Sequence, residues 1–180
     1  MKCSICFSVC LMLLSGTVCA QQNLVINGTF DLEVPTGGTG GGWTALNLDS
    51  GGGWKLVGDN HVFVLNSNGS VQSDPSISQT LTGLSIGSEY QIKGEYCNFY
   101  GFNWCGDAIN PSFGVEIDDS IVLELPYNAQ CPSPFEAFFI TTATEQTIRF
   151  SAERNGLDCD YSIDNIEVIL IDIIFKDSFE

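Results

Sequence analysis

The segment from Cys97 to Asp107 combines flat aromatic rings with amide and acidic side chains, in the order Cys-Asn-Phe-Tyr-Gly-Phe-Asn-Trp-Cys-Gly-Asp. Aromatic rings stack on the C–H faces of pyranose rings, and amides and carboxylates hydrogen-bond to hydroxyl groups. The alternative is that Phe99 or Trp104 caps the core, because most large aromatic side chains are well buried. The residues that we predict to contact a ligand are Phe99, Tyr100, Asn103, Trp104 and Asp107.

Three acidic residues are candidates for catalytic groups. Glu116, Asp118 and Glu124 lie on neighbouring strand-like segments, and glycoside cleavage needs a pair of carboxyl groups. Asp118 is better explained as a turn residue, and the third acid of jelly-roll glucanases is missing. His61, the sole histidine, has no serine or cysteine in a nucleophile-elbow context. We therefore predict no catalytic residue and no enzyme activity.

Residues 1–20 read as a secretory signal peptide. Lys2 precedes an apolar run from Ile5 to Leu14, and the segment ends in Val-Cys-Ala, which suits cleavage after a small residue. We therefore expect a secreted, extracellular protein, or a periplasmic or cell-surface one, whose mature chain begins at Gln21.

The number and positions of the cysteines are consistent with a secreted protein. Four of the eight lie in residues 1–20, and the other four are Cys97, Cys105, Cys131 and Cys159. An even set in an oxidising compartment predicts two disulfides. Of the three possible pairings we favour Cys97 with Cys105 and Cys131 with Cys159, because the first closes a short loop between strand-like flanks. A zinc site is disfavoured, since no Cys-x-x-Cys pair is present.

The charge balance excludes several partners. The chain has 6 Lys and Arg against 22 Asp and Glu, which gives a net charge of −16. Such a field repels phosphate backbones and anionic lipid headgroups. The apolar stretch from Ile163 to Phe175 is broken by acids and is too short to cross a bilayer. We expect neither nucleic-acid binding nor membrane insertion.

Residues 21–172 are predicted to form one all-β domain. Short runs of β-branched and aromatic residues recur between turn residues, without a sustained helical period. The predicted strands are 24–27, 54–57, 61–66, 76–82, 89–97, 112–118, 120–125, 135–142, 146–152 and 160–171. They indicate a two-sheet antiparallel β-sandwich of jelly-roll type. The glycine tracts near Trp43 and Trp54 read as flexible loops, and both tryptophans as core residues.

Several motifs carry a family resemblance. They are Asn-Leu-Val-Ile-Asn-Gly-Thr-Phe-Asp at 23–31, Ser-Ile-Ser-Gln-Thr-Leu-Thr-Gly-Leu at 76–84, Phe-Ile-Thr-Thr-Ala-Thr at 139–144 and Tyr-Ser-Ile-Asp-Asn-Ile-Glu-Val at 161–168. Their order resembles the galactose-binding-like jelly roll of secreted carbohydrate-binding modules of families four, nine and twenty-two. The tail at residues 173–180 resembles the ends of some exported bacterial proteins.

The resemblance implies a structural calcium ion. In similar modules an acid after the Asn-Gly-x-Phe turn and an aspartate of the last strand meet at one edge of the sandwich, which points to Asp31 and Asp164. Glu33 and backbone carbonyls could complete the six to eight oxygen ligands that Ca²⁺ takes. The family more often has glutamate at the position of Asp31. The alternative is that these acids lie in solvated turns.

Two functions are consistent with the sequence. The first is a secreted, non-catalytic carbohydrate-binding protein that recognises a polysaccharide or glycan through aromatic residues of its rim loops. The second is an extracellular or cell-surface structural or adhesion module without a sugar pocket, because the same scaffold serves both purposes.

Overall fold

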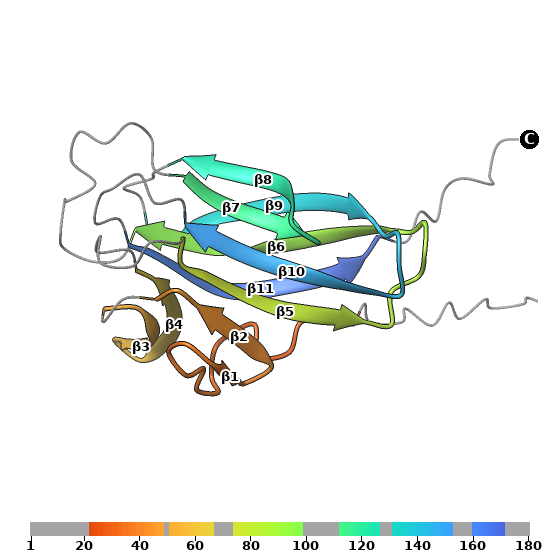
Figure 1. The fold of residues 1–180 in the computed structure, drawn as a ribbon. Helices are drawn as coiled ribbons and strands as arrows, with labels where there is room; N and C mark the ends of the chain where they lie inside the picture. The colour runs from red at the N-terminus through yellow and green to blue at the C-terminus, as the bar shows by residue number, and fades with distance from the viewer. Residues whose placement is uncertain are drawn as a thin grey trace, which may run out of the picture.

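The computed structural model describes residues 22–48, 51–66, 74–98, 112–126, 131–152 and 160–171. All regular structure in these segments is strand (Figure 1). The strands are β1 (Thr39–Gly40), β2 (Trp43–Leu46), β3 (Gly53–Val57), β4 (Asn60–Leu65), β5 (Ser76–Thr82), β6 (Glu89–Asn98), β7 (Ser112–Ile117), β8 (Ser120–Pro126), β9 (Ser133–Ile140), β10 (Glu145–Ala152) and β11 (Tyr161–Leu170). No helix in the described segments is long and apolar enough to span a membrane.

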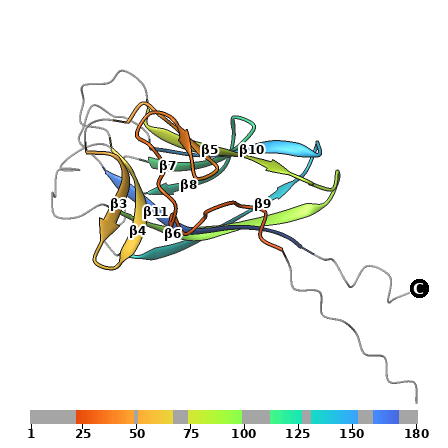
Figure 2. The same cartoon turned by 90° about the horizontal axis from the view of Figure 1, so that it is seen from below.

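The strands form two antiparallel sheets that face each other, as the view from below shows (Figure 2). The six-stranded sheet has the order β1-β2-β5-β10-β7-β8, and the five-stranded sheet has the order β3-β4-β11-β6-β9. The predicted all-β jelly-roll sandwich is confirmed.

Side-chain alternation explains the core between the sheets. In β9 and β10, buried and more exposed residues alternate along each strand, as expected for strands with one face on a core. Phe113 of the six-stranded sheet stacks on Tyr96 of the five-stranded sheet, with ring centroids 5.7 Å apart. Phe150 and Tyr161 also lie against Phe113, at 6.0 and 5.8 Å. These rings join the two sheets in one aromatic core.

The N-terminal segment differs from its prediction, because residues 24–27 do not form a strand. The chain instead turns at Asn27 and Phe30, which have φ angles of 53° and 52°. The turn is held against β11, where Ile166 N donates to Gly28 O at 2.9 Å. Asn27 O also accepts a hydrogen bond of 3.1 Å from Trp43 Nε1. Of the apolar residues in this segment, Val25 is buried and Ile26 is exposed, so the run does not have the pairing of a β-strand.

Both tryptophans contact the core, as the sequence predicts. Trp43 is fully buried, and Trp54 is half-buried, packs against the core and stacks on His61 at 4.3 Å. The glycine tracts are more ordered than predicted, since β1 lies in the first tract and β3 begins at Gly53.

Two local irregularities shape the sheets. The β7–β8 hairpin turns at Asp118 and Asp119, whose φ angles of 47° and 64° are those of a tight hairpin turn. This confirms the predicted turn. In β11, the register with β6 shifts between Asp164 and Glu167, and Asn165 at the shift has a φ of 53°. Such a bulge re-aims the side chains around it.

Candidate functional site

The outer face of the five-stranded sheet is polar along its two central strands. Facing residues of β6 and β11 form the pairs Cys97 with Ser162, Glu95 with Asp164, and Lys93 with Glu167. Because side chains of a strand alternate between faces, these residues point away from the core that Tyr96 and Ile163 enter.

This face is hollowed at two adjoining places. The first hollow has a volume of about 200 Å³ and is lined by Val57, Asn60, Val62, Glu95, Tyr96, Cys97, Cys131, Pro132, Ser162 and Asp164. The second is more open, measures about 540 Å³ and is lined by Lys93, Gly94, Glu95, Pro134, Phe135, Glu136, Asn165 and Glu167. Glu95 belongs to both, so we treat the two hollows as one site and call it the acidic groove.

Asp164 is the most buried acid of the groove, with 6% of its surface exposed. Its Oδ2 accepts a hydrogen bond from Asn60 Nδ2 at 2.6 Å, and its Oδ1 accepts one from Asn165 N at 2.7 Å. Burial raises the pKa of the Asp164 carboxyl; the two hydrogen bonds lower it, and the charges of Glu95 and Asp31 raise it further. A desolvated carboxylate with acidic neighbours is costly unless a positive group approaches it.

The other polar groups of the groove have ordered partners. Asn165 Nδ2 donates to Glu95 Oε2 at 2.9 Å. Lys93 Nζ lies 2.9 Å from Glu167 Oε2, in a pair whose side chains are both 44% exposed. The amine of Lys93 is therefore committed to Glu167, and the groove keeps an excess of negative charge.

A disulfide lines the first hollow, and its pairing differs from the predicted one. Cys97 is bonded to Cys131, with Cα atoms 4.9 Å apart. The predicted pairs Cys97–Cys105 and Cys131–Cys159 are therefore wrong. The observed disulfide depends on contacts between strands that are distant in sequence. β6 and β9 are adjacent in the sheet, and the pairing of Tyr96 with Ser133 brings Cys97 and Cys131 together. Cys105 and Cys159 lie outside the described residues.

The predicted ligand loop also lies outside the described residues. This applies to Phe99, Tyr100, Asn103, Trp104 and Asp107, so their role stays a prediction. The loop begins directly after β6, whose Cys97 lines the first hollow.

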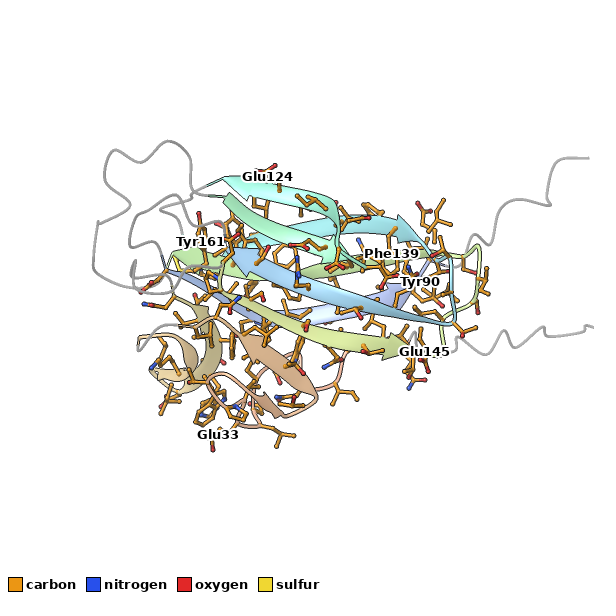
Figure 3. All side chains as sticks on the ribbon, viewed as in Figure 1. Glu33, Tyr90, Glu124, Phe139, Glu145 and Tyr161 are labelled. Atoms are coloured by element: carbon orange, nitrogen blue, oxygen red, sulfur yellow. A yellow bond between two sulfur atoms is a disulfide. The ribbon has the colours of Figure 1, made fainter. Side chains whose placement is uncertain are left out.

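The three predicted calcium ligands differ in their surroundings. Asp164 lies in the groove, whereas Asp31 is exposed and accepts a hydrogen bond of 2.7 Å from the Thr29 hydroxyl. Glu33 is exposed at the edge of the molecule, beside β1 (Figure 3). No three His, Cys, Asp or Glu side chains of the described segments group so that they could hold a metal ion. These side chains do not form a complete calcium shell, and calcium binding stays a prediction.

Of the three acids that are candidates for catalysis, Glu124 is exposed on β8, and the other two have structural partners away from the groove. Glu116, on the six-stranded sheet, accepts hydrogen bonds from Arg149 Nε at 2.9 Å and Ser151 Oγ at 2.6 Å. Asp118 accepts a hydrogen bond of 2.8 Å from Thr147 N.

The sequence prediction missed most of the groove. Asn60, Glu95, Glu136, Ser162 and Glu167 were not singled out. The available signal was the alternation in residues 89–97 and 160–171, where most outward positions are polar. Alternation shows which side chains share one face of a strand, but it does not show which strands are neighbours in the sheet. The groove forms because β6 pairs with both β11 and β9.

No protein-family model matches the chain, and no curated protein sequence matches it. Its fold, however, is similar to solved structures. One is a candidate sugar-binding protein from Bacteroides thetaiotaomicron VPI-5482, with 12% identity, a TM-score of 0.60, and 83% of this chain and 100% of that chain covered. Another is the CBM22-1 xylan-binding domain of Xyn10C from Paenibacillus barcinonensis, with 11% identity, a TM-score of 0.54, and coverage of 84% and 96%.

A third similar structure is TmCBM61 in complex with β-1,4-galactotriose, with 13% identity, a TM-score of 0.51, and 83% of this chain and 99% of that chain covered. At such identities the likeness concerns the fold alone. The resemblance seen in the sequence is thereby confirmed for the architecture: this chain has the jelly-roll fold of carbohydrate-binding modules.

Proposed function

We propose that this chain is a secreted, non-catalytic glycan-binding protein, and that the acidic groove holds the glycan. The observation that carries the proposal is the pair of adjoining hollows on the outer face of the five-stranded sheet, which share Glu95. Carbohydrate sites need a concave surface with a few fixed hydrogen-bonding groups. Asn60, Asn165 and Glu95 supply such groups, and their hydrogen bonds hold the side chains in place.

The similar structures support a saccharide as the ligand class. The Paenibacillus domain binds xylan, and TmCBM61 was solved with galactotriose. The signal peptide predicted at residues 1–20 and the Cys97–Cys131 disulfide support export, since disulfides persist in oxidising compartments.

The test is a binding screen of the mature chain against soluble polysaccharides, by affinity electrophoresis followed by calorimetry. We expect retention by at least one polysaccharide, and at least a tenfold weaker affinity in Glu95→Gln, since hydrogen bonds to a charged group contribute about 1.5–3 kcal/mol. Glu124→Gln is the matched control, because Glu124 is exposed on β8 of the opposite sheet. Equal loss in both variants, or no retention by any glycan, refutes the proposal.

Two additional experiments test the predicted aromatic loop and the predicted calcium ion. A Tyr100→Ala/Trp104→Ala variant tests whether the loop after β6 adds aromatic contacts. Repeating the screen after chelation tests calcium, with a lowered unfolding midpoint expected if the ion is structural. Calcium-dependent self-association without glycan retention would favour a structural or adhesion module instead.

A further inference from the structure

The acidic groove places two carboxylates opposite each other. Asp164 and Glu95 are direct cross-strand partners on the outward face of the sheet. Directly opposed residues have Cβ atoms about 4.5–5.5 Å apart, and like charges in such positions destabilise a sheet. Both side chains line the first hollow, so a group that enters it meets both carboxylates.

No cation of the described segments neutralises this pair. These segments contain Lys55, Lys93 and Arg149. Lys93 is paired with Glu167, Arg149 is paired with Glu116 on the other sheet, and Lys55 lines neither hollow. Within the described segments, the negative charge of Glu95 and Asp164 is therefore not balanced by a cation.

The chemistry of the pair favours an ammonium group over a hydroxyl or a metal ion. A hydroxyl has one donor hydrogen, whereas an ammonium has three donors and a full charge, so it can bond to two carboxylates at once. Ca²⁺ takes six to eight oxygen ligands, and no group of three metal-binding side chains is present in the described segments.

We propose that the groove selects a glycan that carries free primary amines, such as a polymer of glucosamine, with one ammonium between Glu95 and Asp164. This inference rests on the proposed function, because it names the substrate class of the same groove. Glu136 in the second hollow extends the negative surface along the sheet, so that a second amine on the same chain also meets an acid. Uronic acids and sulfated sugars are disfavoured by the same charge.

The experiment compares two tetrasaccharides that differ only in charge: a glucosamine tetramer and its fully N-acetylated counterpart. Calorimetry at about pH 6 and low salt is expected to show at least tenfold tighter binding of the amine form, because a charged hydrogen bond is roughly twice as strong as a neutral one. The preference should fall as sodium chloride is raised, since salt screens partly exposed charges.

Matched variants separate a specific site from general attraction to an acidic protein. Glu95→Gln/Glu136→Gln removes two charges from the groove, and Glu124→Gln/Glu145→Gln removes two exposed charges from the six-stranded sheet (Figure 3). The groove variant should lose the amine preference and the control variant should keep it. An equal reduction in both variants overturns the inference, since it would show unspecific charge attraction.

Other outcomes distinguish this inference from the proposed function. Equal affinity for the two tetrasaccharides overturns the amine preference but leaves a neutral glycan groove. Calcium that competes with the amine form and binds more tightly also overturns it, and assigns the acid pair to a metal. If no saccharide of either kind binds, and the polysaccharide screen is negative, the proposed function fails as well.

Discussion

Removing the Cys97–Cys131 disulfide should destabilise the domain markedly. The bond joins residues separated by 34 positions, and in the chain-entropy model closing such a loop contributes about 4 kcal/mol to the free energy of unfolding. At roughly 2–4 °C per kcal/mol for a domain of this size, a Cys97→Ala/Cys131→Ala variant should melt about 8–16 °C lower. Because both cysteines line the first hollow, glycan affinity should fall as well.

The measurement combines peptide mapping under non-reducing conditions with thermal and urea unfolding. Mapping should recover one linked peptide pair that contains Cys97 and Cys131. Cys105→Ala serves as the control, because it should leave this linkage intact. A peptide that joins Cys97 to Cys105, or an unchanged melting temperature in the double variant, would refute the assignment.

Three further changes test the packing around the groove and the opposite sheet. Gly28→Ala should lower the free energy of unfolding by about 3 kcal/mol in urea titrations, because a Cβ there would lie 2.0 Å from the Ile166 carbonyl oxygen; a wild-type midpoint would contradict this. Glu116→Gln should cost about 2 kcal/mol, since Glu116 is only 5% exposed and its ion pair with Arg149 is lost; an unchanged midpoint would show that the pair does not stabilise the sheet. Asp164→Asn should change the pH dependence: because the folded-state pKa of Asp164 is raised, the wild type should gain stability relative to the variant as the pH falls from about 7 toward about 4, and parallel pH curves would exclude this effect.

Most strands could be predicted because the alternation of apolar and polar residues along a strand can be seen in a short stretch of sequence. The strand predicted at 76–82 coincides with β5, and that at 146–152 differs from β10 by one residue at its start. The prediction for 24–27 was wrong for a conformational reason. Asn27 and Phe30 have left-handed φ angles that turn the chain out of extended geometry, while Val25 and Phe30 are still buried in the core.

The groove and the disulfide could not be predicted in the same way, because both depend on which strands are neighbours. Cys97 and Cys131 meet across β6 and β9, although Cys105 is much nearer to Cys97 in sequence. Likewise, Glu95 and Asp164 become partners only when β11 inserts between β4 and β6. The sequence identified Asp164 through a family resemblance, whereas alternation in residues 89–97 places Glu95 on an outward face but does not show that it lies opposite Asp164.

The two sheets surround a buried acid differently, and this contrast supports the binding role that is proposed for the groove. Glu116 and Asp164 occupy outward positions and are 5% and 6% exposed. Glu116 has Arg149 as its ion-pair partner, whereas Asp164 lies opposite another acid, Glu95. Since the same fold neutralises one buried carboxylate and concentrates charge around the other, the jelly roll does not itself require an uncompensated acid. Stability sacrificed at one face is characteristic of a surface shaped for a ligand, and the Glu116→Gln and Asp164→Asn variants measure that difference directly.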